Sequence, residues 1–284
     1  MTTTKVARDV RLIMTLLARN EEDVLRANLE YHYARGVSFV VATDNASTDG
    51  TGDILRAYER EGRLKLLYET STTYDQARWV TRMAKLARSE FRANWVINND
   101  ADEFWWPEHG DLTEVLSGVP RRFAAVRAPR ANFLPSADDD GPFYERLVYR
   151  LPVGMREDGH RLRGKACHRG RRRLFVHRGA HRVEGPLLRT MPTPPAITVL
   201  HYPRRSWQQF ESKVALGGAA LATWTGTLAG AQLLQEQYDD LLGGRLRARW
   251  DAGVPSAQGL AAGLADGSIV EDRRLAEYFV AHPL

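Results

Sequence analysis

Three carboxylates stand within four residues in the stretch INNDADEFWW, from Ile97 to Trp106. Residues that alternate along an extended chain point to the same side, so Asp100 and Asp102 can converge on one point. A hard divalent cation with oxygen ligands, Mn²⁺ or Mg²⁺, would neutralise this pair and grip a diphosphate. The alternative is a solvated acidic turn, and the motif alone does not separate the two. Glu103 has the opposite side-chain phase and is expected to brace the loop or to meet a basic residue.

A second polar stretch, DNASTDG from Asp44 to Gly50, also follows an apolar run. Its composition predicts a turn with a helix cap at Ser47 or Thr48 and a positive φ at Gly50. Asp44, at the predicted strand end, is in addition placed to accept hydrogen bonds from a base or a ribose. The turn and the ligand contact are compatible, because different residues serve them.

Strand and helix patterns alternate through the first hundred residues. Apolar runs predict strands at Val10–Leu17, Ser38–Thr43, Leu64–Tyr68 and Trp95–Asn98. Helices are predicted after Asn20, which would cap the first of them, and at Asp53–Glu61 and Tyr74–Glu90. This alternation is typical of a parallel, doubly wound α/β sheet, whose ligands bind outside the carboxyl ends of the strands. Asn20, Asp44 and Asp100 should therefore share one edge of the sheet.

After Pro107 the pattern is less regular and rich in arginine. Strands are predicted at Ala124–Val126, Phe143–Tyr149, Leu174–His177 and Ile197–His201, and helices at Asp111–Ser117, Ser206–Ala222, Gly226–Leu242 and Asp272–Val280. The uncharged run between Lys213 and Glu236 is as long as a membrane span, but its glycines, threonines and glutamine favour a buried or interfacial helix pair.

Composition bounds the class of protein. The 284 residues allow one large domain or two small ones, and the formal net charge is +5 with a pI near 9.4. A single cysteine, Cys167, excludes an intramolecular disulfide and a cysteine-rich zinc site. The first ten residues have no apolar signal-peptide core, so we expect a cytoplasmic protein, or one peripheral at the inner face of the membrane.

The order of three motifs, ARNEE, DNASTDGT and DADEF, each after a predicted strand, resembles the nucleotide-sugar glycosyltransferases of the GT-A fold, of the family 2 type. The DEFW ending and the later HYPRRS with a downstream lysine resemble a branch akin to family 92. The resemblance covers Leu12 to Glu103 and Leu200 to Lys213. It implies a GT-A-like α/β fold, with a donor-binding half over residues 1–110 and an acceptor-binding half over 111–284, within one continuous domain.

The resemblance also implies a metal-dependent, inverting transfer from a nucleoside-diphosphate sugar, with UDP favoured, to a hydroxyl of a glycan, a lipid-linked or a small-molecule acceptor. Asp44 would hold the base, Asp100 the ribose or the metal, and Asp102 the Mn²⁺ or Mg²⁺ that bridges the diphosphate. Asn20 and Glu21 would line the nucleotide pocket. Asn45 and Ala46 stand where the commoner motif has Asp-Gly, which leaves their contacts open.

Further candidates complete the predicted site. His201 would join the metal shell or bond to backbone, and the basic residues Arg204, Arg205, Lys213 and Lys165 would face the donor phosphates. The general base would be Glu184, placed as the resemblance implies, with Asp138 and His181 as rivals. Trp105 and Trp106 would floor the acceptor site or pack.

Two other function classes stay open. A nucleotidyltransferase would need a glycine-rich phosphate loop after the first strand, where this chain has the acidic ARNEE. A non-catalytic module would use the basic stretch from Arg161 to Arg182, which could alternatively hold an anionic acceptor or rest on an anionic membrane. Nucleic acid is not expected, because no base-reading motif accompanies that stretch. The sequence does not indicate an oligomeric state.

Overall fold

The computed structural model describes residues 10–71, 75–222 and 232–284. The chain forms two compact units. Of the described residues, the first unit comprises 10–71, 75–130 and 162–200, and the second comprises 131–161, 201–222 and 232–284.

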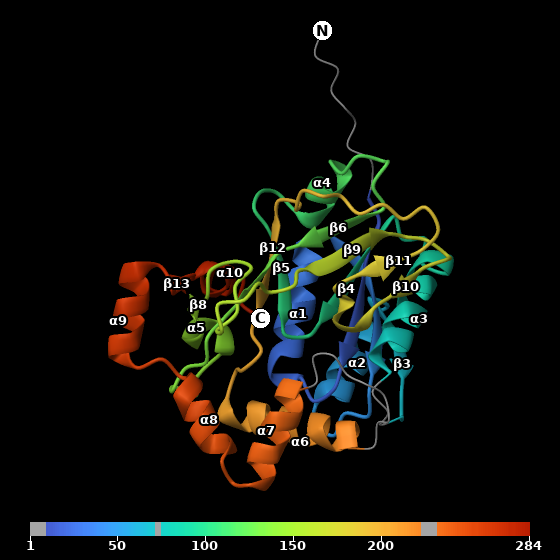
Figure 1. The fold of residues 1–284 in the computed structure, drawn as a ribbon. Helices are drawn as coiled ribbons and strands as arrows, with labels where there is room; N and C mark the ends of the chain where they lie inside the picture. The colour runs from blue at the N-terminus through green and yellow to red at the C-terminus, as the bar shows by residue number, and fades with distance from the viewer. Residues whose placement is uncertain (1–9, 72–74, 223–231) are drawn as a thin grey trace. The chain divides into compact units, whose positions relative to one another are not determined.

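The first unit contains a six-stranded sheet of order β3-β2-β1-β4-β9-β6 (Figure 1). Its strands are β1 (Leu12–Ala18), β2 (Val37–Asp44), β3 (Leu64–Tyr68), β4 (Trp95–Asp100), β6 (Ala125–Ala128) and β9 (Lys165–Arg169). The four strands from β1 to β4 run parallel, and β9 pairs antiparallel with both β4 and β6. The predicted α/β class with a mostly parallel sheet is confirmed.

Helices α1 (Glu22–Ala34) and α3 (Gln76–Ser89) lie on opposite faces of this sheet (Figure 1), and α2 (Thr51–Arg60) precedes β3. The face under α3 is a buried cluster that includes Ile13, Val41 and Val96 from the strands and Val80 and Met83 from the helix. Alternate residues of each strand point to one face, so a continuous apolar strand can serve helices on both sides.

The chain also forms several smaller elements. Strand β5 (Glu103–Pro107) belongs to a three-stranded sheet of order β5-β12-β7, with β12 at Ile197–His201 and β7 at Arg130–Asn132. Helix α4 (Leu112–Ser117) follows β5, and Asp111 caps it by accepting a hydrogen bond from the amide of Glu114. A hairpin of β10 (Phe175–Val176) and β11 (Val183–Glu184) carries the short 3₁₀ turn η1 (Arg178–Ala180).

The second unit is mainly helical. Its elements are α5 (Phe143–Arg146), β8 (Tyr149–Arg150), α6 (Trp207–Ala222), α7 (Gln232–Leu242), α8 (Leu246–Gly253), α9 (Ala257–Asp266), β13 (Val270–Glu271) and α10 (Arg274–Ala281). The predicted strand Phe143–Tyr149 is wrong over its first half. Its aromatic residues suggested a strand, but Pro142, with φ −65°, starts a helical turn and Arg146 Nε donates back to Gly141 O.

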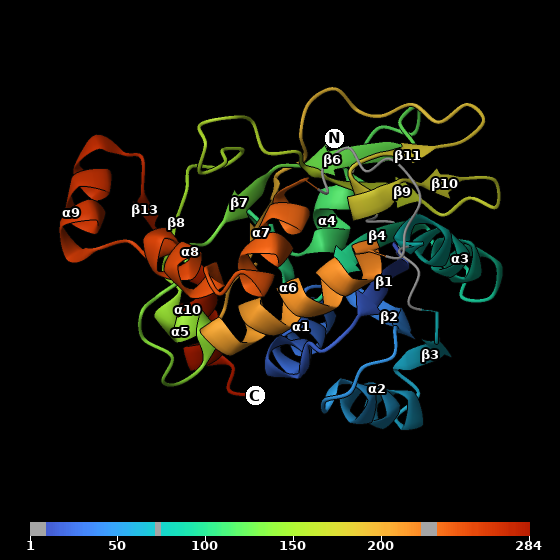
Figure 2. The same cartoon turned by 60° about the horizontal axis from the view of Figure 1, so that its bottom comes forward.

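The uncharged run is divided between α6 and α7, which lie side by side (Figure 2). Glycines allow their close approach, since a Cβ on Gly218 would lie 2.1 Å from the ring of Tyr238. This arrangement agrees with the expected helix pair, although residues 223–231, where the second helix was predicted to begin, lie outside the described part of the chain. Among the helices of the described residues, none has both the length and the apolar character needed to span a bilayer.

Two fully buried histidines of the first unit make its stability depend on pH. Burial lowers the pKa of both His32 and His168 to about 4. His32 is neutral, because Nδ1 contacts the carbonyl of Asn28 while Nε2 accepts a hydrogen bond from the amide of Trp105 and therefore carries no proton. An unfolded histidine binds a proton near pH 6.5, so the unfolded state takes up more protons than the folded state between pH 6.5 and 4.

We therefore expect the free energy of unfolding to fall by about 2 kcal/mol per buried histidine between pH 7 and pH 5. Replacing His168 with leucine should reduce that fall by about one histidine's share, whatever the variant's stability at pH 7. Urea unfolding at the two pH values measures the difference. The same substitution at the exposed His109 is the control, and an equal pH response in all three proteins would contradict the assignment.

Candidate active site

The motifs ARNEE and DNASTDG fold against each other. Asn20 has a positive φ of 53°, and its Oδ1 accepts from the amide of Thr48 at 2.8 Å while its Nδ2 donates to Thr48 Oγ1 at 3.2 Å. Its own amide donates to Ser47 Oγ at 3.1 Å. The prediction that Asn20 caps α1 is wrong, because its side chain forms hydrogen bonds with the neighbouring loop. Glu21 is at the N-cap position of α1 instead.

The next residues extend this network of hydrogen bonds, which locks the two loops together. The amide of Glu21 donates to Thr51 Oγ1 at 2.8 Å, and the amide of Gly50 donates to Glu22 Oε2 at 2.6 Å. Gly50 has a φ of −68°, so the predicted positive φ is wrong at that position and occurs at Ala46 instead. A Cβ on Gly50 would lie 2.6 Å from Glu22 Oε2, so the glycine serves close approach rather than backbone conformation.

Strand register brings Asp44 and Asp100 to one edge. Ala18 of β1 pairs with Asp44 of β2, and Leu17 of β1 pairs with Asp100 of β4. Both carboxylates thus end strands that flank β1, as the strand pattern predicted. Asp44 is buried, and its Oδ1 accepts from the amide of Ser47 at 3.0 Å.

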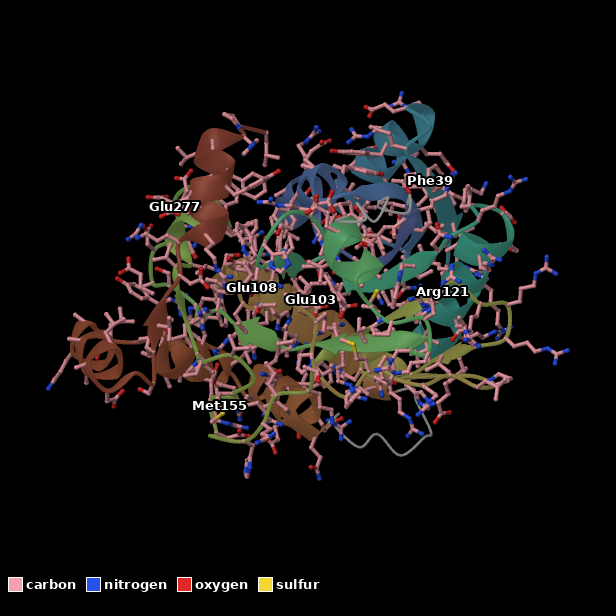
Figure 3. The ribbon with its side chains drawn as sticks, turned by 90° about the horizontal axis from the view of Figure 1, so that it is seen from above. Phe39, Glu103, Glu108, Arg121, Met155 and Glu277 are labelled. Carbon is pink, nitrogen blue, oxygen red and sulfur yellow. The ribbon has the colours of Figure 1, made fainter. Side chains whose placement is uncertain are left out.

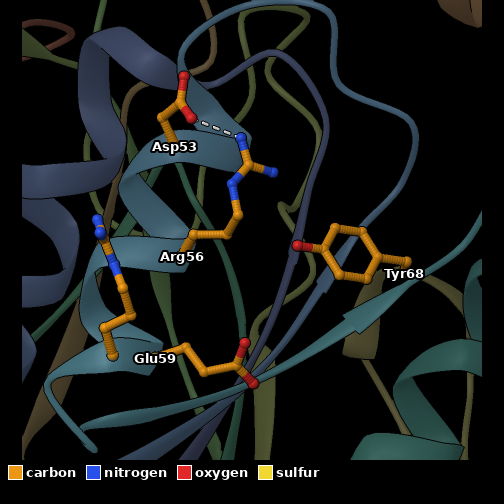
Figure 4. A pocket seen from close by; sticks show the side chains of 5 residues that line it. Asp53, Arg56, Glu59 and Tyr68 are labelled. Atoms are coloured by element: carbon orange, nitrogen blue, oxygen red, sulfur yellow. Dashed lines mark hydrogen bonds and ion pairs between the residues drawn. The ribbon is translucent and has the colours of Figure 1, made fainter.

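A hollow of about 600 Å³ adjoins this edge between α2 and β3 (Figure 4). It is lined by Asp53, Arg56, Glu59, Arg60 and Tyr68. Tyr68 pairs in register with Asp44, and 56% of it is exposed. Gly52 separates the hollow from Asp44, since a Cβ there would lie 3.1 Å from both Arg56 Nη1 and Asp44 Oδ2. The sequence analysis did not single out Arg56 and Tyr68, although Tyr68 is an aromatic residue at the end of a predicted strand.

The acidic stretch contains a cation supplied by the protein. Lys165 of β9 is fully buried, and its Nζ donates to Asp100 Oδ2 at 2.5 Å and to the carbonyl of Gly179 at 2.9 Å. The same Nζ lies 3.0 Å from Oε2 of Glu103, which is also fully buried and is labelled in Figure 3. Burial alone would lower the pKa of Lys165, but the charges of Asp100 and Glu103 outweigh it and raise the pKa. The lysine therefore remains an ammonium.

Glu103 has a second basic partner. Arg130 Nη1 donates to Glu103 Oε1 at 3.2 Å, so the carboxylate lies between two cations. The expectation that Glu103 meets a basic residue is confirmed. Asp102 is also buried, 3% exposed, which is inconsistent with the solvated acidic turn that was the alternative for this motif.

The two tryptophans differ in environment. Trp105 is fully buried and its Nε1 donates to Asn99 Oδ1 at 3.0 Å, which places it in the core. Trp106 is half-buried, with its ring stacked on Tyr31 and the guanidinium of Arg35 5.0 Å from its centroid. Of the pair, Trp106 is the one with a surface that a ligand can reach.

The candidates for the general base lie in different places. His181 adjoins the Lys165 cluster: its Nδ1 contacts the carbonyl of Gly164 at 2.9 Å, and burial and the charge of Lys165 lower its pKa to about 4. Glu184 is at the open end of the hairpin, where His177 Nε2 lies 3.1 Å from it and lowers its pKa. Asp138 belongs to the second unit and accepts from the amide of Asp140.

The remaining predicted site residues also belong to the second unit. Nδ1 of His201 lies 2.8 Å from Asn132 Oδ1, and Arg204 pairs with Glu157. Arg205 is buried and donates to the carbonyl of Tyr202, whereas Lys213 is exposed on α6.

The donor set limits how a metal could bind. Among the residues that the structure describes, there is no group of three or more His, Cys, Asp or Glu side chains that could hold a metal ion. Mg²⁺ is commonly held by one or two carboxylates together with substrate phosphates, and Asp102 with Asp100 fits that mode. The residues therefore fit a cation that arrives with a diphosphate rather than one held in a protein cage.

The lock between the two loops gives a stability prediction. Asn20→Ala removes the contacts to Thr48 and leaves a side chain at a positive φ, so we expect a loss of about 2 kcal/mol in the free energy of unfolding. Asn20→Gly removes the same hydrogen bonds but tolerates that φ, and should be the more stable of the two by about 1 kcal/mol. Urea unfolding compares them, and equal losses would show that the backbone conformation is not strained.

Part of the chain matches a known protein family. Residues 13–122 match the model of glycosyltransferase family 92, whereas no curated protein matches the sequence. TarS 1–349 from S. aureus in complex with UDP is 12% identical, covering 95% of this chain and 89% of that one at a TM-score of 0.41. The mannosyltransferase PcManGT from Pyrobaculum calidifontis, in complex with GDP-Man and Mn²⁺, is 15% identical, covering 96% and 81% at 0.41. Glucosyl-3-phosphoglycerate synthase from Mycobacterium tuberculosis, with Mg²⁺ and UDP, is 15% identical, covering 43% and 44% at 0.31.

The family match spans the strand and helix units from β1 to α4 and includes Asp44, Asp100 and Asp102. It coincides with the stretch in which the motifs resemble GT-A enzymes, and it ends before the HYPRRS segment at His201. Motif order, sheet topology and family model agree on the same residues. The chain is a glycosyltransferase, and its residues 13–122 form a family 92 domain.

Proposed function

We propose that this glycosyltransferase takes its sugar from a nucleoside-diphosphate sugar, with UDP favoured, and binds it at the carboxyl edge of β2, β1 and β4. The observation that carries the proposal is the register that sets Asp44 and Asp100 on either side of β1. Ligands of open α/β sheets bind at this edge. A nucleotidyltransferase is less well supported, because the loop after β1 is occupied by the Asn20 lock rather than by a phosphate-binding loop.

The nucleoside would lie toward β3. Asp44 offers a carboxylate to the base, and the exposed ring of Tyr68 offers a surface on which a base can stack. Arg56, on the other side of Gly52, can reach a ribose or phosphate oxygen. The diphosphate would then lie toward β4, where Asp102 and Asp100 would hold the Mn²⁺ or Mg²⁺. When bound, that cation supplies stabilisation of the charge that grows on the departing diphosphate.

Transfer with inversion requires a group that takes the proton of the acceptor hydroxyl as it attacks the anomeric carbon. His181 is favoured over Glu184 and Asp138, because it adjoins the cluster that holds Asp100. With Nδ1–H directed to Gly164 O, Nε2 carries the lone pair. The acceptor stays a hydroxyl of a glycan, a lipid-linked or a small molecule.

Donor binding should depend on Asp102. We expect Mn²⁺ and UDP together to raise the melting temperature more than either alone, with stabilisation of about 2.7 kcal/mol at a hundredfold excess over Kd. Asp102→Asn should remove the cooperative part, because it removes a metal-binding charge without changing side-chain size. Asp111→Asn, which keeps its capping oxygen, is the control and should behave like wild type. A wild-type protein that shows no metal-dependent shift with any nucleoside diphosphate would refute the proposal.

The base assignment predicts a loss of turnover. His181→Gln keeps a donor for Gly164 O but cannot take a proton, so kcat should fall by about 10²- to 10⁴-fold with little change in the donor KM. The matched change His177→Gln, in the same hairpin, should leave kcat within a few-fold of wild type. Full activity of His181→Gln would exclude this histidine and return Glu184 to first place.

A further inference from the structure

The buried ammonium of Lys165 contacts a carboxylate that is also a predicted ligand of the metal. Its Nζ is 2.5 Å from Oδ2 of Asp100, one of the two carboxylates of the DAD motif. A divalent cation and this ammonium require the same carboxylate charge. The contact is made by the protein itself, from a strand 65 residues further along the chain.

The surroundings hold Lys165 independently of Asp100. The carbonyl of Gly179 at 2.9 Å and the carboxylate of Glu103 at 3.0 Å are two further acceptors for an ammonium that has three donors. Gly164, immediately before β9, packs so closely that a Cβ there would lie 2.3 Å from the carbonyl of Ala128. The lysine is thus fixed in place, and it keeps two of its three partners if Asp100 turns away.

Asp100 is the partner in this arrangement that is open to solvent. A third of its side chain is exposed, 33%, whereas Lys165 and Glu103 are both at 0%. Glu103 also has Arg130 at 3.2 Å, so it does not depend on Lys165 for its only opposite charge. Asp100 can therefore exchange the ammonium for another cation at its solvent side without leaving a buried charge uncompensated.

We propose that Lys165 is an internal counter-cation that competes with the divalent metal for Asp100 and thereby makes metal binding depend on the nucleoside diphosphate. Without the nucleotide, Lys165 neutralises Asp100 and a metal finds a weakened site. With the nucleotide, the diphosphate supplies oxygens and negative charge that shift the competition toward the metal. Lys165 is a positioning residue, and the inference rests on the proposed donor site.

The test is a gain of binding, which a merely structural lysine would not produce. Mn²⁺ alone is titrated into the full chain without nucleotide, and the unbound ion is followed by electron paramagnetic resonance. Lys165→Met should bind Mn²⁺ at least tenfold more tightly than wild type, because Asp100 regains its charge. Lys65→Met, at an exposed position of β3, removes the same net charge and should leave the affinity within twofold. Unchanged or weaker binding in a folded Lys165→Met variant would overturn the proposal.

Two double variants complete the design. Asp100→Asn with Lys165→Met should lose the gain, and a gain that persists would show that the metal binds elsewhere and would refute the proposal. Glu103→Gln with Lys165→Met removes a charge of each sign from the interior. It reports the same gain if the single variant does not fold.

A nucleotide series separates this inference from the proposed function. In wild type, UDP should raise the Mn²⁺ affinity, and in Lys165→Met that enhancement should be at least fivefold smaller. If wild type binds no nucleotide, the proposed donor site fails, while the titration with Mn²⁺ alone still reads the competition for Asp100. If nucleotide binds but the enhancement is equal in both proteins, only the role of Lys165 fails.

Discussion

The ammonium of Lys165 buried between Asp100 and Glu103 is the interaction on which the candidate site depends. It connects the end of β4, the start of β5, the strand β9 and the turn η1 through one atom. Charges taken out of water are costly unless their partners are in place. At the apolar end of β4, the acidic motif is therefore stabilised by a cation that a distant strand supplies.

A second constraint shapes the opposite side of the same edge. The loops that begin at Asn20 and Asp44 satisfy each other's backbone amides through Ser, Thr, Asn and Glu side chains. Most polar residues of these motifs are thereby used for structure. The side chains left facing the edge are few, and Asp44 with the neighbouring Tyr68 is the pair that the registers align. Most polar residues of these motifs thus serve the structure of the two loops, and few of their side chains are left to face a ligand.

The two halves of the chain differ in how much their sequence discloses. Strands β1 to β4 and their helices follow from periodicity, because each is a long apolar run or an amphipathic pattern. Strand β9 was missed, since Lys165 and His168 inside it resemble a basic surface although both are buried. Phe143 was assigned to a strand on its aromatic character, and the proline before it decided otherwise. In such short elements, tertiary packing outweighs local preference.

By itself, the sequence determined the α/β class and the position of Asp44 and Asp100 at strand ends, because alternation and strand length are local properties. Only the tertiary structure decided which positive charge neutralises the acidic motif. The partner, Lys165, lies 65 residues from Asp100, and its antiparallel pairing beside β4 depends on contacts that no local spacing encodes. It likewise decided that Asn20 locks two loops together, because its acceptor oxygen meets an amide 28 residues away.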